Sequence, residues 1–278
     1  MLSYRHSYHA GNFADVIKHI VVIEILEYLV RKEGAFAYID THAGAGLYNL
    51  RSAHATKLQE YSNGIAKLES AAWPELAGYF QILAKLNPSG ELINYPGSPL
   101  IAMQFLRPQD RTWLYEMHPT DFEILQKNTA MDARVRIMRE DGFKGLLAQV
   151  PPVSRRGLIL VDPSYEIKTD YPRVTETVTQ ACKKFSTGIY AIWYPVVDRR
   201  RIEEMARTFI RSGIRNIQRF ELGIAAESED RGMPAAGMIV INPPWTLREK
   251  MSLLLPRLVA ALGTDAGAYS KCDVLVGE

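Results

Sequence analysis

Two turns in this chain combine residue types that could bind a nucleoside and act on an amine. Each follows a short apolar run that ends in an acidic residue, Asp40 in the first turn and Asp162 in the second. The first turn continues through Gly44 and Gly46, and the second continues into Pro163-Ser164-Tyr165. Buried parallel strands deliver polar groups to their carboxyl edge in this way, and ligands of open α/β sheets bind at that edge. The pair predicts a cofactor-binding loop and a platform for a flat base that carries an amine.

The second turn has the groups needed to activate an adenine amine. That nitrogen donates its lone pair into the ring and is a poor nucleophile. If the Asp162 carboxylate and the Pro163 carbonyl each accept one N–H, the nitrogen becomes more tetrahedral and its lone pair points at an electrophilic methyl group, so displacement follows from positioning. Tyr165 would stack on the base, which contributes about 1–3 kcal/mol. Asp162 could also take up the released proton, because the sequence identifies no separate general base.

The glycine turn after Asp40 favours S-adenosylmethionine over a dinucleotide. Asn49 stands where a dinucleotide-binding turn has its third glycine. The turn also does not open directly into a helix, as that motif requires. Gly44 is therefore a candidate for close backbone contact with the methyl donor, because it has no Cβ.

Two later strand ends supply candidates for the rest of the cofactor site. Glu116 is the last residue of the second expected strand, where its carboxylate could bind ribose hydroxyls. Asp141 and Gly142 follow the third strand, where the carboxylate could accept from the adenine amine and the glycine leaves room for the ring. The structural alternatives are a solvated strand end for Glu116 and a helix cap for Asp141.

The apolar pattern predicts the elements that must hold these residues. Asn12 is expected to cap a helix over residues 13–32. The expected strands cover residues 35–40, 112–116, 135–139, 157–162, 188–194, 216–222 and 238–242. Most are separated by segments long enough for a helix, which is typical of an α/β, Rossmann-like fold with a mostly parallel sheet. We expect a single domain over residues 1–278.

An insertion is expected after the first strand. Asp40 and Glu116 are 116 − 40 = 76 positions apart, whereas a strand-helix-strand unit needs about 30 residues. Residues 60–70 and 74–86 carry helical apolar spacing, so we place a small helical subdomain at residues 49–95. Ser98 is then expected to cap a helix that begins at Pro99 and runs to about Leu106.

A second proline-rich strand end, Asn242-Pro243-Pro244-Trp245, looks like the turn at Asp162. Asp162 ends the fourth expected strand, beside the first, where strand order reverses and ligands collect. Asn242 ends the seventh strand, which is antiparallel in the methyltransferase version of this fold. We therefore interpret residues 242–245 as a structural turn at the opposite edge of the sheet.

Composition narrows the class of protein. The chain has 33 basic and 31 acidic residues, a net charge of +2 that does not by itself indicate nucleic-acid binding. Its two cysteines, Cys182 and Cys272, form no pair at metal-binding spacing. The most apolar helix candidate, residues 20–30, contains Glu24 and Glu27. We expect a cytoplasmic protein with no membrane span, no disulfide framework and no metal site.

Over nearly its whole length the chain resembles the ribosomal large-subunit RNA adenine-N6 methyltransferase J family. The shared segments are Tyr4-Arg5-His6-Ser7-Tyr8-His9-Ala10-Gly11-Asn12, Asp40-Thr41-His42-Ala43-Gly44-Ala45-Gly46, Tyr95-Pro96-Gly97-Ser98-Pro99, Arg155-Arg156-Gly157-Leu158-Ile159-Leu160, Arg231-Gly232-Met233 and Asn242-Pro243-Pro244-Trp245. The resemblance implies a class I methyltransferase fold, with a seven-stranded, mostly parallel sheet and a helical insertion. It also implies S-adenosylmethionine-dependent methylation of one adenine in 23S ribosomal RNA.

The resemblance also implies roles for individual residues. Cofactor contacts would fall on His19, His42, Ser98, Glu116, Asp141, Gly142 and Asp162, with Lys18 nearby. Asp162 would be catalytic, and Tyr4 would touch the target base. The family pattern has two prolines before the tyrosine, and this chain has Ser164 in place of the second. Because Asp162, Pro163 and Tyr165 are retained, we expect a change in turn rigidity more than a loss of chemistry.

Three basic residues are expected near the cleft that holds the RNA. Lys168 follows the platform, Arg199 follows the fifth strand, and Arg231 lies in the turn after the sixth. We expect them to contact phosphates while Tyr4 and Tyr165 handle an extruded adenine, because a base inside a helix cannot reach the methyl group. Short basic runs are also common on solvated faces, which is the structural alternative.

Two other functions remain open from the sequence. A DNA adenine methyltransferase would use the same platform, since discrimination depends on contacts to the ribose 2′-hydroxyl. A non-catalytic nucleic-acid-binding protein linked to the use of external DNA is the second, because relatives of the family have carried that label. We expect a monomer that acts on 23S ribosomal RNA before the ribosome is fully assembled.

Overall fold

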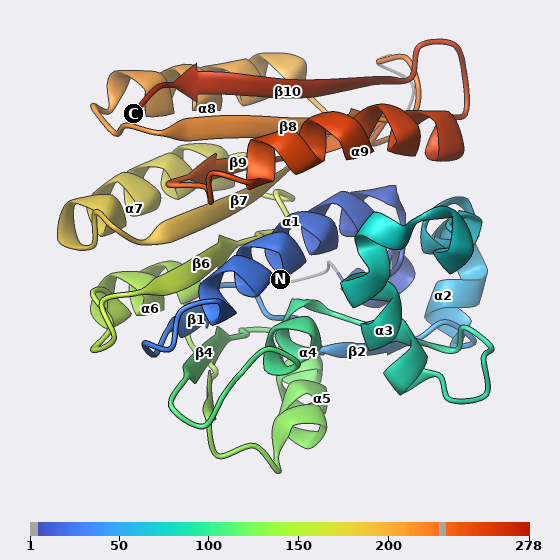
Figure 1. Ribbon diagram of the computed structural model, residues 1–278, viewed down its shortest axis with the longest axis horizontal. Coiled ribbons are helices and arrows are strands. Elements are labelled where there is room, and N and C mark those ends of the chain that lie inside the picture. The colour runs from blue at the N-terminus through green and yellow to red at the C-terminus, as the bar shows by residue number, and fades with distance from the viewer. Residues whose placement is uncertain (1–4, 228–231) are drawn as a thin grey trace.

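An eight-stranded sheet forms the centre of the computed structural model, which describes residues 5–227 and 232–278 (Figure 1). Its strands are β1 (Ala37–Asp40), β4 (Arg111–Tyr115), β5 (Val135–Met138), β6 (Gly157–Val161), β7 (Ile189–Val196), β8 (Ile217–Gly223), β9 (Ala235–Ile241) and β10 (Tyr269–Val276). They lie in the order β10-β8-β9-β7-β6-β1-β4-β5. All seven expected strands form, and the α/β class is confirmed.

The directions of the strands also agree with the expectation. The neighbours β5, β4, β1, β6 and β7 are parallel. The seventh expected strand, β9, runs antiparallel to both β7 and β8. The eighth strand, β10, was missed, because its residues are half-exposed and carry only a weak apolar pattern. It pairs antiparallel with β8 and forms one edge of the sheet.

Helices cover both faces of the sheet (Figure 1). They are α1 (Phe13–Val30), α2 (Ala53–Leu58), α3 (Ala77–Leu86), α4 (Ser98–Met103), α5 (Pro119–Thr129), α6 (Gly142–Gln149), α7 (Asp170–Lys184), α8 (Arg199–Arg211) and α9 (Leu247–Leu262). In Figure 1, α1 and α9 lie in front of the sheet, while α6, α7 and α8 lie behind it. No helix within the described ranges 5–227 and 232–278 combines the length and apolar character needed to cross a bilayer.

Helix α1 begins where the sequence predicts. The Asn12 side chain accepts hydrogen bonds from the backbone N–H groups of Ala14 and Asp15, which satisfies donors that a helix N-terminus leaves open. The helix is buried on almost all sides, because it packs against the sheet, α3, α4 and α9. Polar residues on α1 are therefore buried as well and need partners.

The segment between β1 and β4 differs in detail from the expected helical subdomain at 49–95. It opens and closes with a two-stranded sheet, β2 (Leu47–Asn49) and β3 (Asn94–Pro96). The helix expected over 60–70 is replaced by short 3-10 turns at Glu60–Asn63, Ile65–Lys67 and Ser70–Ala72, with a further turn at Pro74–Leu76 before α3. Gly64 packs so closely on Gly11 that a Cβ there would lie 2.1 Å from the Gly11 carbonyl oxygen. Close packing thus overrides the helical pattern.

Ser98 was expected to cap the next helix, but the cap of α4 is Gly97 and Ser98 is the first helical residue. The helix also ends at Met103, three residues before the expected Leu106. The Ser98 hydroxyl instead donates to the buried Asp40 carboxylate at 2.6 Å. A partner from the neighbouring strand therefore replaces a local cap.

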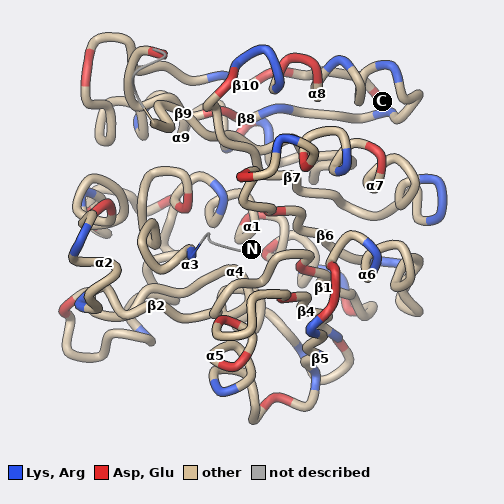
Figure 2. Tube along the Cα trace, turned by 180° about the vertical axis from the view of Figure 1, so that it is seen from behind, with Lys and Arg blue, Asp and Glu red and all other residues tan. Residues whose placement is uncertain are grey.

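A cluster of charges holds the β10 edge of the sheet, and in Figure 2 basic and acidic segments alternate along α8, β8 and β10. Glu221 of β8 is fully buried. Arg199 donates to both of its oxygens, at 2.9 and 2.8 Å, and the Tyr194 and Tyr269 hydroxyls each donate at 2.8 Å. Burial opposes ionisation, but the hydrogen bonds and charge of Arg199 prevail and lower the pKa of Glu221 to about 2.

Replacing Glu221 by Gln should lower the free energy of unfolding by about 3 kcal/mol at pH 7, because it leaves Arg199 short of a buried partner. The pKa of Glu221 is lower in the folded protein, so its contribution is present above the unfolded value and is lost as pH falls toward 2. Denaturant titrations at pH 7 and pH 3 should therefore show a smaller difference between wild type and variant at pH 3. Glu227→Gln, at the exposed end of the cluster, is the matched control and should cost less than about 1 kcal/mol. Equal effects at both pH values would contradict this account.

Candidate active site

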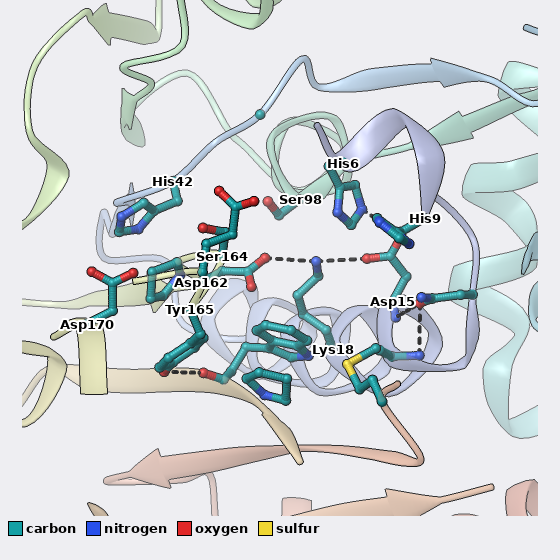
Figure 3. Close-up of a pocket in the computed structure, with 18 of the residues that line it drawn as sticks. His6, His9, Asp15, Lys18, His42, Ser98, Asp162, Ser164, Tyr165 and Asp170 are labelled. Atoms are coloured by element: carbon teal, nitrogen blue, oxygen red, sulfur yellow. Dashed lines mark hydrogen bonds and ion pairs between the residues drawn. The ribbon is translucent and has the colours of Figure 1, made fainter. Parts of the chain in front are cut away.

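A cavity of about 1240 Å³ lies at the carboxyl ends of the parallel strands (Figure 3). The residues that follow β1, β4, β5, β6 and β7 all contribute to its wall. The two acidic turns predicted from the sequence therefore meet in one site. Lining residues used below are His42, Gly44, Ser98, Glu116, Asp141, Gly142, Phe143, Asp162, Pro163, Tyr165, Lys168, Arg173, Trp193 and Arg201.

The centre of the site is an ion pair between Asp162 and Lys18. The Lys18 ammonium lies 2.8 Å from one Asp162 oxygen and 2.8 Å from Asp15 (Figure 3). Burial raises the pKa of Asp162, against the opposing charge of Lys18. No donor among the described residues reaches the second Asp162 oxygen. The carboxylate lines the cavity and is held through one oxygen, so its second oxygen can accept a hydrogen bond from a ligand.

Asp15 connects this pair to the N-terminal segment. It is buried and accepts from the Gly11 backbone N–H, and it pairs with His6 at 2.9 Å. Burial opposes its ionisation, yet the charges of His6 and Lys18 keep the pKa of Asp15 well below its ordinary value. Asp15 was not among the residues predicted from the sequence, although its position three residues before Lys18 on α1 places both on one helix face.

Asp40 shapes the glycine turn without lining the cavity. It is fully buried and accepts from the Tyr38 and Ser98 hydroxyls and from the His42 backbone N–H. Burial raises the pKa of Asp40 to about 6. His42 lines the cavity, and burial lowers its pKa to about 4, so its ring is neutral at pH 7. Ser98 also lines the cavity, but its hydroxyl already donates its hydrogen bond to Asp40.

Glu116 and Gly44 form one wall together. The Gly44 N–H donates to one Glu116 oxygen at 2.8 Å, and the His118 N–H donates to the other at 2.7 Å. Each oxygen retains a lone pair that could accept from a hydroxyl group. Gly44 has φ +61, and a Cβ there would lie 2.3 Å from the Tyr48 hydroxyl. Both the conformation and the space require glycine at this position.

Asp141 and Gly142 bring the start of α6 against the end of β1. Asp141 caps the helix by accepting from the backbone N–H groups of Phe143 and Lys144. Asp141 is therefore a helix cap, as the structural alternative predicted, and it also lines the cavity. A Cβ on Gly142 would lie 1.9 Å from the Thr41 carbonyl oxygen, so only glycine allows this approach.

Tyr165 and Trp193 form an aromatic wall beside Asp162. The Tyr165 hydroxyl donates to the Trp193 carbonyl at 2.7 Å, and its ring lies 4.5 Å from that of Tyr171. Ser164, which stands where the family pattern has its second proline, and Tyr165 both line the cavity. Trp193 was missed by the sequence analysis, although an aromatic residue near the end of the fifth expected strand was a signal. Its buried indole N–H has no hydrogen-bond partner among the described residues.

One expected cofactor contact, His19, lies away from the cavity wall. His19 is fully buried beneath the site, within 3.3 Å of the Tyr79 hydroxyl and 2.9 Å of the Tyr95 hydroxyl, and burial lowers its pKa to about 3. It does not line the cavity. Tyr4 and Arg231 lie outside the described residues.

Of the basic residues expected near the cleft, Lys168 lines the cavity and Arg199 does not. Lys168 is exposed at the rim of the cavity, as expected. Arg199 was expected to face the cleft, but it does not line the cavity and its guanidinium is bound to Glu221 and Glu227. Arg201, two positions along α8, lines the cavity instead and lies over the Tyr171 ring. The charges of β8, which the sequence pattern did not connect with α8, explain the difference.

The second proline-rich turn is structural, as predicted. The Asn242 amide donates to the carbonyls of Ser186 and Gly188, at 2.7 and 2.8 Å. Those residues precede β7, so Asn242 lies at the edge opposite Asp162. None of residues 242–245 lines the cavity. The antiparallel direction of β9 thus distinguishes two similar motifs.

The donor set fits a nucleoside cofactor. The carboxylates of Glu116 and Asp141 lie after β4 and β5. Gly44 and Gly142 have no room for a Cβ, because it would clash with neighbouring atoms. The cavity is larger than the roughly 300–1,000 Å³ usual for a small-molecule site, so it has room for a second flat group at Asp162. This arrangement can hold a nucleoside and orient an amine.

Comparison with known proteins points in the same direction. The family model described as "Ribosomal RNA large subunit methyltransferase D, RlmJ" matches residues 33–274. "Ribosomal RNA large subunit methyltransferase J" of Escherichia coli K12 is 50% identical over 280 residues, with 100% of both chains covered. The protein of the same name from Haemophilus influenzae is 48% identical, with 94% of each chain covered. A crystal structure of a Legionella pneumophila protein superposes with a TM-score of 0.87 at 35% identity and covers 96% of this chain and 98% of that one.

Replacing Lys18 by Met should destabilise the protein by about 3 kcal/mol at pH 8, because Asp162 and Asp15 then lose the buried cation between them. The pKa of Asp162 would rise further in the folded variant. A raised folded pKa gives stability that is present at low pH and lost as pH rises, so the deficit should shrink at pH 5. Denaturant titrations at both pH values measure this, with the exposed Lys168→Met as control. A deficit that grows at pH 5 would contradict the ion-pair account.

Proposed function

The chain belongs to the RlmJ family of ribosomal RNA large subunit methyltransferases, and from that premise we propose that it transfers a methyl group from S-adenosylmethionine to N6 of one adenine in 23S ribosomal RNA. The membership confirms the resemblance recognised in the sequence. The observation that supports the finer proposal is that Asp162 lines the cavity while Lys18 pairs with only one of its two oxygens. The cytoplasm, where ribosomal RNA is accessible, is the proposed location.

The acidic strand ends would hold the cofactor. Glu116 would accept from the ribose hydroxyls, and Asp141 would accept from the adenine amine beside Gly142. Gly44, Ser98 and His42 complete the wall around these groups. Bound S-adenosylmethionine supplies an electrophilic methyl group on a sulfonium centre.

Asp162 and the Pro163 carbonyl would orient the target amine. Lys18 holds Asp162 in place, so the free oxygen can accept one N–H while the carbonyl accepts the other. The nitrogen lone pair then points away from the base plane, toward the cofactor side of the cavity. Tyr165 is held by the Trp193 carbonyl, so its ring offers a preorganised face for stacking on the extruded base.

Replacing Asp162 by Asn should reduce methyl transfer about 100-fold or more, because the amide presents N–H donors beside the target amine and loses its pairing with Lys18. Transfer of labelled methyl from S-adenosylmethionine to protein-free 23S ribosomal RNA, followed by identification of the modified nucleoside, measures this. Calorimetric binding of S-adenosylhomocysteine shows whether the variant keeps the cofactor site.

Asn242→Ala is the matched control in the second proline-rich turn and should keep its turnover per folded molecule. Label on duplex DNA alone would overturn the RNA assignment. Label on RNA that survives in Asp162→Asn would overturn the role of the carboxylate.

Lys168 is the described basic residue that best fits contact with the RNA backbone, because it is exposed at the cavity rim just after the catalytic turn. Lys168→Glu should weaken RNA binding and reduce the slope of log affinity against log salt by about 1. Lys183→Glu, an exposed lysine in the last turn of α7, should leave both unchanged. Filter binding across a salt series measures the slopes. Equal losses in both variants would show a general charge effect rather than a local contact.

A further inference from the structure

Arg173, in the first turn of α7, occupies the adenine end of the cavity. Its guanidinium donates to the Asp141 carboxylate through Nη2. Its Cζ lies 4.4 Å from the centre of the Phe143 ring. Arg173, Asp141 and Phe143 all line the cavity. Arg173 has no role in the proposed binding of the cofactor or in methyl transfer.

The bond to Arg173 uses the Asp141 oxygen that a ligand would need. Oδ1 of Asp141 already accepts from the backbone N–H groups of Phe143 and Lys144, at 3.0 and 3.4 Å. Oδ2 is the oxygen bound to Arg173. Burial opposes ionisation of Asp141, but the hydrogen bond and charge of Arg173 lower its pKa. The carboxylate is therefore charged and satisfied in this structure.

A guanidinium and an adenine can make the same two contacts here. Both are flat, both carry N–H donors at one edge, and both stack on aromatic faces. Arg173 satisfies a carboxylate with its edge and covers Phe143 with its face. An adenine ring with its amine on Asp141 would need the same oxygen and would lie against the same part of the wall.

We propose that Arg173 is an intramolecular competitor for the cofactor's adenine and must leave Asp141 and Phe143 before that adenine binds. The inference rests on the proposed function, because the adenine concerned is that of S-adenosylmethionine. It makes Arg173 a residue that sets cofactor affinity, and it takes no part in methyl transfer.

The contacts of Arg173 allow it to move. The side chain is 43% exposed, and Asp141 is its only ion-pair partner among the described residues. Ion pairs this exposed contribute about 0–1 kcal/mol. Displacement therefore weakens cofactor binding by a modest factor and does not block it.

Arg173→Ala should bind S-adenosylhomocysteine about two- to fivefold more tightly than wild type in isothermal titration calorimetry. Arg173→Lys should fall between them, because lysine can pair with Asp141 but cannot stack as a plane. Arg207→Ala, an exposed arginine of α8, is the matched control and should bind as wild type does. Weaker or unchanged binding by Arg173→Ala would overturn the inference and, if weaker, would make Arg173 a clamp on bound adenine.

A second ligand distinguishes competition for the Asp141 oxygen from a general gain in affinity caused by removal of the Arg173 side chain. S-inosylhomocysteine carries a carbonyl oxygen in place of the amine, which Asp141 repels and Arg173 can donate to. Arg173→Ala should therefore gain less affinity for this ligand than for S-adenosylhomocysteine, because both rings compete with Arg173 for Phe143 but only the adenine amine competes for the Asp141 oxygen. An equal gain for both ligands would overturn the competition for Asp141.

Wild-type binding of S-adenosylhomocysteine separates this inference from the proposed function. If no protein in the series binds it, the proposed cofactor falls and the inference falls with it. If all of them bind it equally, the cofactor assignment stands and only the role of Arg173 is overturned.

Discussion

The buried ammonium of Lys18 is the interaction on which the site depends. It lies 2.8 Å from both Asp15 and Asp162, residues far apart in the chain. Two carboxylates cannot stay ionised this close in a buried setting unless a cation lies between them. Asp15 in turn binds His6 and the Gly11 backbone. One lysine therefore joins the N-terminal segment, α1 and the turn after β6, and it fixes the carboxylate that faces the cavity.

Strand direction decides which residues this centre can use. The parallel strands β1, β4, β5, β6 and β7 bring their carboxyl ends to one edge, and the cavity forms there. Antiparallel β9 sends Asn242 to the other edge, where its amide closes the start of β7. Glycine is required where the backbone approaches closest, as at Gly142 against Thr41. The same sheet therefore separates the turn at Asp162, which lines the cavity, from a structural turn of similar composition.

The net charge does not show which basic side chains could bind a ligand, because most of those near the site already have acidic partners. Arg199 is bound to Glu221 and Glu227, and Arg173 is bound to Asp141. Lys168 is left exposed at the rim. The net charge of +2 therefore does not show that Arg199 and Arg173 are paired with carboxylates while Lys168 is exposed at the cavity.

The α/β class, the seven expected strands and the acidic strand ends could be predicted from the sequence, because periodicity and turn chemistry are local properties. The structural role of the turn at Asn242 could not be predicted from its local pattern, and it followed from the strand direction known for the methyltransferase version of the fold. It left out β10, whose half-exposed residues have a weak pattern. Tertiary packing determines which side chains already have partners. His19 faces two tyrosines, Arg199 faces a buried glutamate, and Lys18 faces Asp162. These pairings join residues distant in the chain, and their distances are set by strand order and helix packing.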